Sequence, residues 1–490
     1  MFKDLKALGK ESLIYGLSTV GARLLNFILL PFYTHYLVPA EYGIVAAVFS
    51  YIAFLNIVYH YGMDQAYMRH YADREKALPA SFICLAATTA LLTLGLCAFA
   101  PFWAGASGLG AGNYRLVYYS AAILLLDTIT IIPFADLRMA HRPLRFAGIR
   151  TLSIVVNVAL NVYFLKFRGW GIESVFAANI ISSAAAALLL VPEFSRVTLR
   201  VDLPVLRSLA AFALPLLPAG LGAMAVQVLD RPIMLRLSDT ASVGVYQANY
   251  RLGIFMMLVV SMFDQAWRPF FIERSHRPDA PVVFARVLTY FTAGGLFLWL
   301  LLSFFIGDLA RLRLAGINLI HPDYWGGLSI VPVVLAAYLL NGVYVNFLAP
   351  VIIAKRTAVI MSVTFAGAAV SIAGNFAFIP LFGMTGAAWT VLLSYAVMAA
   401  LIYLRGRSFY PVPYEFPRLA GFCAVALACA APVYVFSPQG PGGFALKLGC
   451  LAVFPAAAWF SGLVLPEEKE ALGRFLARFS PAPGQKTSAG

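Results

Sequence analysis

The sequence has little charge, and acidic side chains are the scarcest. Only 12% of the 490 residues are Asp, Glu, Lys or Arg, about half of the roughly 25% usual in soluble domains. So little charge excludes a cytosolic enzyme, a disordered protein and a secreted scaffold. The five cysteines lie in apolar runs without CxxC spacing, so neither a disulfide framework nor a metal site is expected.

Catalytic motifs are also missing. The chain has no HExxH, GxSxG, P-loop or DxD pattern, and its six histidines are scattered. The longest breaks between apolar runs, near 193–207 and 309–324, are too short to fold into a domain. We therefore expect no enzyme and no cofactor. Without an ATPase domain, the energy for any transport must come from an H⁺ or Na⁺ gradient, the membrane potential or the substrate's own gradient.

Apolar residues are what the sequence has in excess. They make up 61% of the chain, and the mean hydropathy is +0.82. A membrane-spanning helix needs about 20 mostly apolar residues. The runs predict an all-α polytopic membrane protein with about fourteen spans, at 12–33, 41–62, 78–101, 114–137, 146–166, 171–192, 208–235, 243–267, 284–308, 325–350, 357–381, 384–404, 418–437 and 444–465. Spans 11 and 12 meet at a tight turn, Pro380 to Thr385.

The basic residues indicate the orientation of these spans. If the N-terminus is cytoplasmic, 25 Lys and Arg lie in cytoplasmic segments, 7 lie on the opposite side and 4 lie within spans. This bias follows the positive-inside rule and predicts cytoplasmic N- and C-termini. Because the +14 net charge is spread over short loops, a nucleic-acid partner is not expected.

An internal repeat divides the spans. A shift of 201 residues places Gly21, Pro31, Gly43 and Phe54 on Gly222, Pro232, Gly244 and Phe255, and a slip of one aligns Asp64-Gln65-Ala66 with Asp264-Gln265-Ala266. Parallel repeats of this kind enclose a site at their interface. We predict an N-lobe at 1–195, a cytoplasmic linker at 196–207, a C-lobe at 208–407, and two further spans with a tail at 408–490.

Polar residues deep in spans are the candidate binding residues, because they are costly in a membrane and usually face a cavity or a partner. The candidate substrate-binding residues are Arg23, Arg251, Arg150, Arg231, Asn26 and Gln247. Asp127 and Asp230 are either structural counter-ions or ion-coupling carboxylates. Arg150 and Arg231 could instead snorkel to head groups.

Four charged residues at the cytoplasmic ends of spans 2 and 8 form a second candidate group. Asp64 and Asp264 are related by the repeat, and Arg69 and Arg268 follow them. We interpret the four as a cytoplasmic gate.

Arginine outnumbers carboxylate at depth. A cavity with surplus guanidinium suits an anion, because the planar arginine fork matches phosphate oxygens bidentately. A lipid-linked sugar carried on a pyrophosphate is an anion of this kind.

Two stretches carry a resemblance to a known family. Residues 15–43, YGLSTVGARLLNFILLPFYTHYLVPAEYG, resemble the opening of polysaccharide-biosynthesis flippases, and residues 375–388, NFAFIPLFGMTGAA, resemble that family's turn between helices 11 and 12. The family belongs to the multidrug/oligosaccharidyl-lipid/polysaccharide (MOP) superfamily and includes the Wzx-type O-antigen flippases.

The resemblance implies a MATE-like fold of two six-helix lobes around a cationic cavity, with two extra C-terminal helices. It implies an inner-membrane flippase that moves an undecaprenyl-pyrophosphate-linked oligosaccharide by alternating access. Membrane lipids, glycosyltransferases and a polysaccharide polymerase are then expected partners. By position, Arg23 and Arg251 match the family's cavity arginines, and the last two helices would hold the polyprenyl tail.

Two alternatives from the same superfamily stay open. A lipid II flippase is disfavoured because span 2 carries Asn56, Tyr59 and His60 where lipid II flippases carry charges. A MATE-type cation-coupled antiporter shares the repeat, but typically has twelve spans and relies on membrane carboxylates.

Overall fold

The structure is a computed structural model that describes residues 21, 25, 27–195, 197–198, 200–314, 316–436 and 440–470. Most of the described residues are in helices. The two strands among them, β1 (Arg313–Leu314) and β2 (Ile317–Asn318), form a short antiparallel pair. This confirms the all-α fold class. The chain divides into two compact units: unit 1 comprises Met1–Ser275 and Ile306–Pro411, and unit 2 comprises His276–Phe305 and Val412–Gly490.

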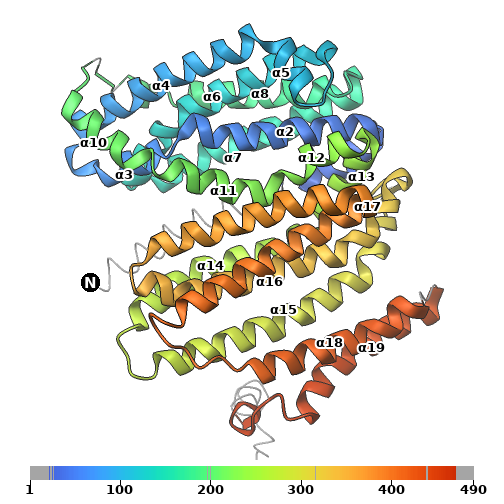
Figure 1. Cartoon of the computed structure of the whole chain (residues 1–490). Coiled ribbons are helices and arrows are strands. Elements are labelled where there is room, and N and C mark those ends of the chain that lie inside the picture. The colour runs from blue at the N-terminus through green and yellow to red at the C-terminus, as the bar shows by residue number, and fades with distance from the viewer. Residues whose placement is uncertain are drawn as a thin grey trace, which may run out of the picture. The chain divides into compact units, whose positions relative to one another are not determined.

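The first half of unit 1 has helices of very different lengths. They are α2 (Pro39–His60), α3 (Met63–Arg69), η1 (Tyr71–Asp73), α4 (Arg74–Ala98), α5 (Ala100–Ala106), η2 (Ala111–Asn113), α6 (Tyr114–Met139), α7 (Pro143–Tyr163), the π-helical turn η3 (Phe164–Arg168), α8 (Glu173–Leu189) and α9 (Val191–Phe194). Helix α6 packs against α2, α4 and α8, and α7 packs against α8 (Figure 1).

The rest of the chain is also built from helices of different lengths. Unit 1 continues with α10 (Leu203–Ala213), α11 (Leu216–Val228), α12 (Asp230–Leu237), α13 (Thr240–Tyr250), η4 (Arg251–Gly253), α14 (Ile254–Arg274), η5 (Pro322–Ile330), α16 (Val331–Ile353) and α17 (Thr357–Gly406). Helix α15 (Ala280–Arg311) runs from unit 2 into unit 1, while α18 (Phe416–Phe436) and α19 (Gly440–Phe460) belong to unit 2.

Eleven helical runs among the described residues are long and apolar enough to cross a membrane. Predicted span 6 corresponds to α8, which is apolar but has only 17 residues, and span 1 lies mostly outside the described ranges. The 50-residue helix α17 covers predicted spans 11 and 12, with a non-helical residue at Gly383 (φ 56°, ψ −134°). That break lies inside the predicted turn. Eleven runs support a multi-pass membrane protein, and the count of fourteen stays a prediction.

The long run from Pro39 to Arg69 also contains a break. Tyr61 (φ 34°) and Gly62 (φ 78°) are both left-handed, so the hydrogen-bond ladder of α2 stops and α3 starts afresh. At the other end of α2, Pro39 occupies the first turn and the Glu41 carboxylate accepts the Val38 N–H at 3.2 Å.

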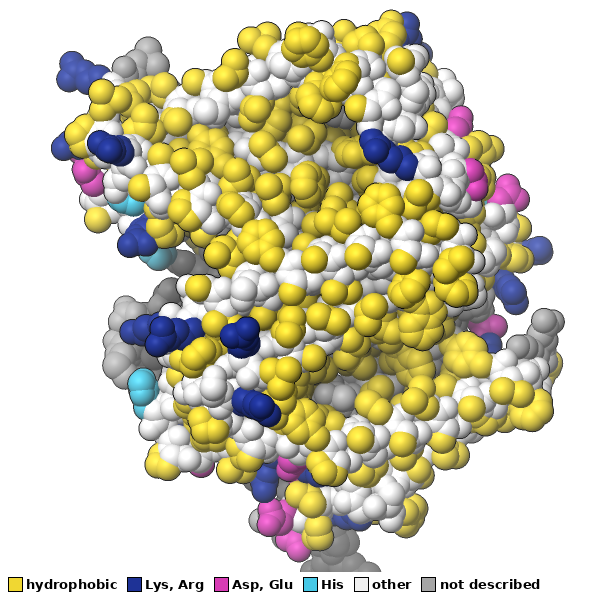
Figure 2. Space-filling view, in the orientation of Figure 1, with side chains coloured by type: hydrophobic (Ala, Val, Ile, Leu, Met, Phe, Trp, Pro, Cys, Tyr) yellow, Lys and Arg dark blue, Asp and Glu magenta, His cyan; other side chains and the backbone are white. Residues whose placement is uncertain are grey.

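The surface is that of a protein in lipid. Large apolar side chains point outward along the helices, including Leu91 (71% exposed) and Leu144 (76%). Figure 2 shows hydrophobic side chains over most of the visible face, with Lys and Arg toward the helix ends. Without a bilayer, such an apolar surface would aggregate.

Candidate functional site

A buried ion pair anchors the site at the start of α12. The Asp230 side chain is 1% exposed and that of Arg231 is 6% exposed. The Arg231 guanidinium donates to Asp230 Oδ1 at 2.7 Å, to the Gln227 carbonyl at 2.6 Å and to Gln247 Oε1 at 2.9 Å. The Tyr246 hydroxyl donates to the other carboxylate oxygen at 2.5 Å. The charge of Arg231 is therefore neutralised by its sequence neighbour.

Arg251 lies in a different environment. Helix α13 ends at Tyr250, and the 3₁₀ turn η4 places Arg251 in the middle of a long apolar run. Its guanidinium carbon lies 5.6 Å from the ring centroid of Tyr33 and 5.9 Å from that of Tyr42. One terminal nitrogen, Nη1, is buried and has no hydrogen-bond partner among the residues that the structure describes. A charged donor left unsatisfied in a membrane segment points to a ligand that supplies the acceptor.

These residues surround a cavity of about 250 Å³ inside unit 1. It is lined by Phe27, Arg231, Gln247, Tyr250, Arg251, Ile254, Met257 and Tyr338. The structure thus brings together four of the predicted residues: Arg231, Arg251 and Gln247 on the wall, with Asp230 behind. Among the described residues at the cavity, two guanidinium groups carry positive charge and one carboxylate carries negative charge, so the cavity is cationic.

The other deep pair lies apart from this cavity, in the first half of unit 1. Asp127 on α6 accepts a hydrogen bond from the Ser183 hydroxyl of α8 at 2.6 Å. The Arg150 guanidinium of α7 lies 4.1 Å from the ring centroid of Phe134. Within the described part of the chain, Asp127 and Arg150 are not close enough to form an ion pair.

The remaining predicted residues have different outcomes. Arg23 and Asn26 lie outside the described residues. Asp264 and Arg268 form an exposed ion pair at 2.7 Å within α14. Arg69 of α3 instead stacks over Phe212 at 4.5 Å, and no ion pair with Asp64 occurs among the described residues. The gate formed by these four residues stays a prediction.

Comparison with known proteins decides the family. The sequence profile of the family described as "Polysaccharide biosynthesis protein" matches residues 8–274, more than half of the chain. The chain belongs to this family. No curated protein matches it.

Solved structures share the fold of this polysaccharide biosynthesis protein. The lipid II flippase MurJ, inward closed, matches with a TM-score of 0.69 and 12% identity, over 92% of this chain and 99% of that one. An inward-facing multidrug MATE transporter of the MOP superfamily matches at 0.61 and 15%, over 79% and 94%. A MOP transporter from Pyrococcus furiosus, described as having a binding pocket of reverse polarity, matches at 0.58 and 13%, over 82% and 95%. The fold is therefore the one found in these membrane transporters and in the lipid II flippase.

Tyrosines are the functional residues that sequence reasoning missed. Tyr250 packs over the Arg231 guanidinium at 4.1 Å, and the Tyr338 hydroxyl lies 3.3 Å from that of Tyr250. The available signal was the spacing of two pairs: Tyr250 follows Tyr246 by four residues, and Arg251 follows Gln247 by four. Each pair lies about one helical turn apart, on the same face of a helix. Aromatic faces hold a guanidinium in place while leaving its N–H groups free to bind an anion.

A second cluster that was not predicted lies at the Lys- and Arg-rich helix ends in the first half of unit 1. Asp136 on α6, 1% exposed, accepts two hydrogen bonds from Arg74 at 2.7 Å each and a third from the Tyr67 hydroxyl at 2.6 Å. This bidentate pair ties α3, α4 and α6 together.

At the opposite helix ends, α2 and α13 cross at the repeat-related glycines. A Cβ on Gly43 would overlap the Thr240 carbonyl, and a Cβ on Gly244 would overlap the Pro39 carbonyl. The 201-residue shift relates both contacts, because it places Pro39 on Thr240 as well as Gly43 on Gly244. The crossing is therefore symmetric. Asp239 caps α13 by accepting the Ser242 N–H at 2.8 Å, and these hydrogen bonds lower the pKa of its carboxyl.

Removing the Asp230 charge should destabilise this polysaccharide biosynthesis protein. Asp230→Asn leaves Arg231 charged and unpaired in a buried position, which typically costs about 3–5 kcal/mol. We expect a clear drop in the apparent Tm of the detergent-solubilised protein. The exposed carboxylate variant Asp73→Asn is the control and should keep the wild-type Tm. Asp230→Asn combined with Arg231→Gln should recover part of the loss. Equal Tm values for Asp230→Asn and wild type would show that the pair is not stabilising.

Proposed function

We propose that this protein is a flippase that moves an undecaprenyl-pyrophosphate-linked oligosaccharide across the bacterial inner membrane. The carrying observation is the unsatisfied Arg251 guanidinium in a cationic cavity that also contains Arg231. A pyrophosphate supplies acceptors in the planar arrangement that arginine recognises. The family description, polysaccharide biosynthesis, supports a glycan as the cargo.

The proposed transport uses alternating access between two states. The crossing of α2 and α13 at Gly43 and Gly244 keeps the two halves of unit 1 together at one end of the helices. With the predicted orientation, that end is periplasmic, so the cavity exchanges with the cytoplasmic side. Opening the crossing would release cargo outward, and H⁺ or Na⁺ coupling through Asp127 belongs to the same proposal.

The ion pair of Asp230 bears on the MATE alternative. A carboxylate that binds a transported cation needs free oxygen atoms, whereas Asp230 already accepts from Arg231 and Tyr246. Asp127 accepts from Ser183 but has a second carboxylate oxygen. The arrangement favours an anionic cargo over a cationic drug.

Transport by the purified protein in proteoliposomes tests the proposal. The probe is a fluorescent polyprenyl-pyrophosphate disaccharide, with accessibility to a membrane-impermeant quencher as the readout. We expect translocation of this probe and none of a matched polyprenyl glycoside that lacks phosphate. Equal translocation of both probes would contradict a role for the arginine cavity. Extrusion of cationic dyes without movement of either lipid would instead support the antiporter.

A further inference from the structure

Unit 2 contains a larger cavity, of about 690 Å³, which shares no lining residue with the arginine cavity of unit 1. Its walls come from α15, α18, α19 and the segment that follows α19. Its lining is mostly apolar and includes Phe422, Phe454, Ala458 and Trp459, together with the charged side chains of Arg286, Arg418, Glu467 and Glu468, which we call the rim. A lining that combines apolar and charged side chains is what an amphipathic ligand requires.

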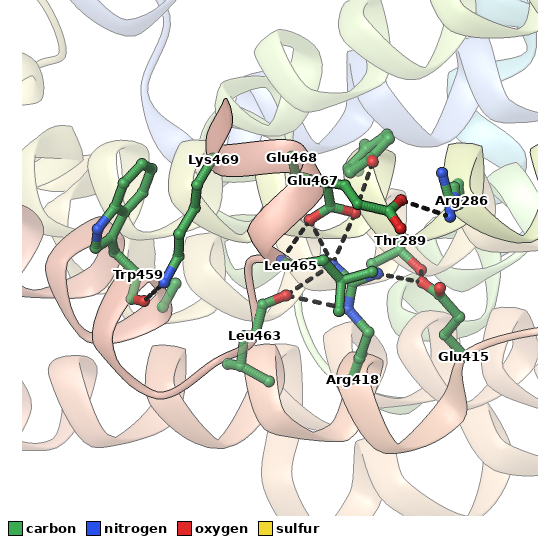
Figure 3. A network of polar contacts seen from close by, with 12 residues as sticks. Arg286, Thr289, Glu415, Arg418, Trp459, Leu463, Leu465, Glu467, Glu468 and Lys469 are labelled. Atoms are coloured by element: carbon green, nitrogen blue, oxygen red, sulfur yellow. Dashed lines mark hydrogen bonds and ion pairs between the residues drawn. The ribbon is translucent and has the colours of Figure 1, made fainter. Parts of the chain in front are cut away.

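Most of the charged rim is already committed to internal contacts (Figure 3). The Arg418 guanidinium donates to Glu415 at 2.7 Å, to Glu468 at 2.9 Å and to the Leu463 carbonyl at 2.7 Å. Glu468 also accepts the Leu465 N–H at 2.8 Å and the Tyr290 hydroxyl at 2.7 Å. Burial would raise the pKa of Glu468, but these donors outweigh it and the pKa lies below its usual value. This network holds the segment after α19 against α15 and α18.

Two rim residues have capacity left for a ligand. The Arg286 and Glu467 side chains are 3.5 Å apart and are 40% and 79% exposed. An exposed ion pair of this length contributes little stability, so either group can exchange its partner for a ligand group. Figure 3 shows the pair beside the Arg418 network. The rim therefore offers one cation and one anion side by side.

We propose that this cavity binds a zwitterionic aminophospholipid of the phosphatidylethanolamine class. The phosphate meets Arg286, the ammonium group meets Glu467, and an acyl chain lies over Phe422 and Phe454. The charged side chains that line the cavity, Glu467 and Glu468 with Arg286 and Arg418, balance in sign, so a head group with one charge of each sign matches them better than a head group that carries a negative charge alone. Trp459 and Tyr290 suit the head-group level, because their rings are apolar and their tips polar.

This lipid is a resident partner of unit 2, distinct from the cargo of unit 1. The site does not depend on the proposed function, since its residues belong to a separate compact unit. Bound lipid would fix α18 and α19 against α15.

Native mass spectrometry of the full-length protein tests the proposal. Delipidated protein is incubated with phosphatidylethanolamine or phosphatidylglycerol of identical acyl chains, or with polyprenyl phosphate. We expect wild type to retain phosphatidylethanolamine at least fivefold better than the other two. Arg286→Ala should lose this retention about tenfold, and Glu467→Gln should lose the preference over phosphatidylglycerol.

Exposed Arg277 provides the matched control, because it belongs to the same unit but does not line the cavity. Arg277→Ala should retain lipid like wild type, and all variants should keep the wild-type Tm in detergent, since both rim residues are exposed. Equal or stronger binding of phosphatidylglycerol or polyprenyl phosphate by wild type would overturn the proposal. So would unchanged retention in Arg286→Ala.

Discussion

Arg251→Ala should reduce translocation of a polyprenyl-pyrophosphate probe by about 10- to 100-fold, because a hydrogen bond to a charged group contributes about 1.5–3 kcal/mol. The variant should still fold. Among the described residues, Arg251 forms no ion pair, and one of its donors is unsatisfied. Removing the guanidinium therefore leaves no buried carboxylate without its partner. The measurement is the initial transport rate per reconstituted molecule, with the apparent Tm as a check on folding.

Two further variants distinguish charge from geometry. Arg251→Lys keeps the charge but loses the planar fork, and should recover only part of the rate if the contact is bidentate. Arg115, an exposed arginine at the start of α6, is the control for a general loss of positive charge. A rate for Arg115→Ala as low as that for Arg251→Ala would mean that net charge, rather than the cavity, determines transport.

Gly43→Ala should lower transport at least tenfold by preventing α2 and α13 from crossing. The added methyl group would overlap the backbone carbonyl of Thr240, which cannot move aside as a side chain can. In a two-state cycle, a substitution that excludes one closed state leaves the protein in the other. The corresponding change Gly244→Ala should act in the same way, because its methyl group would meet the Pro39 carbonyl.

Gly95→Ala is the matched control for this prediction. Gly95 is also a helical glycine in an apolar run, but a Cβ there has no atom within 4 Å. It should therefore keep wild-type transport and gain slightly in stability, since alanine is favoured in helix interiors. A second readout is thiol labelling of Gln247→Cys in a protein without its native cysteines. Gly43→Ala should raise labelling of the cysteine from the Pro39 end of the helices. Unchanged labelling together with wild-type transport would show that the crossing of α2 and α13 does not control access to the cavity.

The apolar runs predicted much of the fold because they are local. Length and hydropathy located the long helices, and the turn after Pro380 was visible as a break that the structure places at Gly383. The second span was predicted to end at residue 62, and the structure breaks the helix there, at Tyr61 and Gly62. The left-handed conformation of Tyr61 was not predicted, because tyrosine rarely adopts it.

The candidate site was predicted only in part. Depth in a span selected both Arg231 and Arg251 as candidates, and left open whether Arg231 reaches the head groups. Among the described residues, the structure pairs Arg231 with Asp230 and leaves Nη1 of Arg251 without a hydrogen-bond partner. The difference comes from side-chain direction and from residues on other helices, such as Tyr33 and Tyr42. The Arg418 network was likewise not predicted, since its hydrogen-bonded residues lie up to 178 positions apart in the sequence.

The sequence by itself determined that this is a membrane protein of the polysaccharide biosynthesis family, because hydropathy and family motifs are readable along the chain. Only the tertiary structure decided which arginine is available to an anion and where the repeats touch. Gly43 meets Thr240 and Gly244 meets Pro39 across about 200 residues, and such contacts depend on how helices cross. Ion pairs and close helix contacts depend on which residues are neighbours in the folded chain. The sequence pattern can therefore suggest candidate residues, but it cannot choose among them.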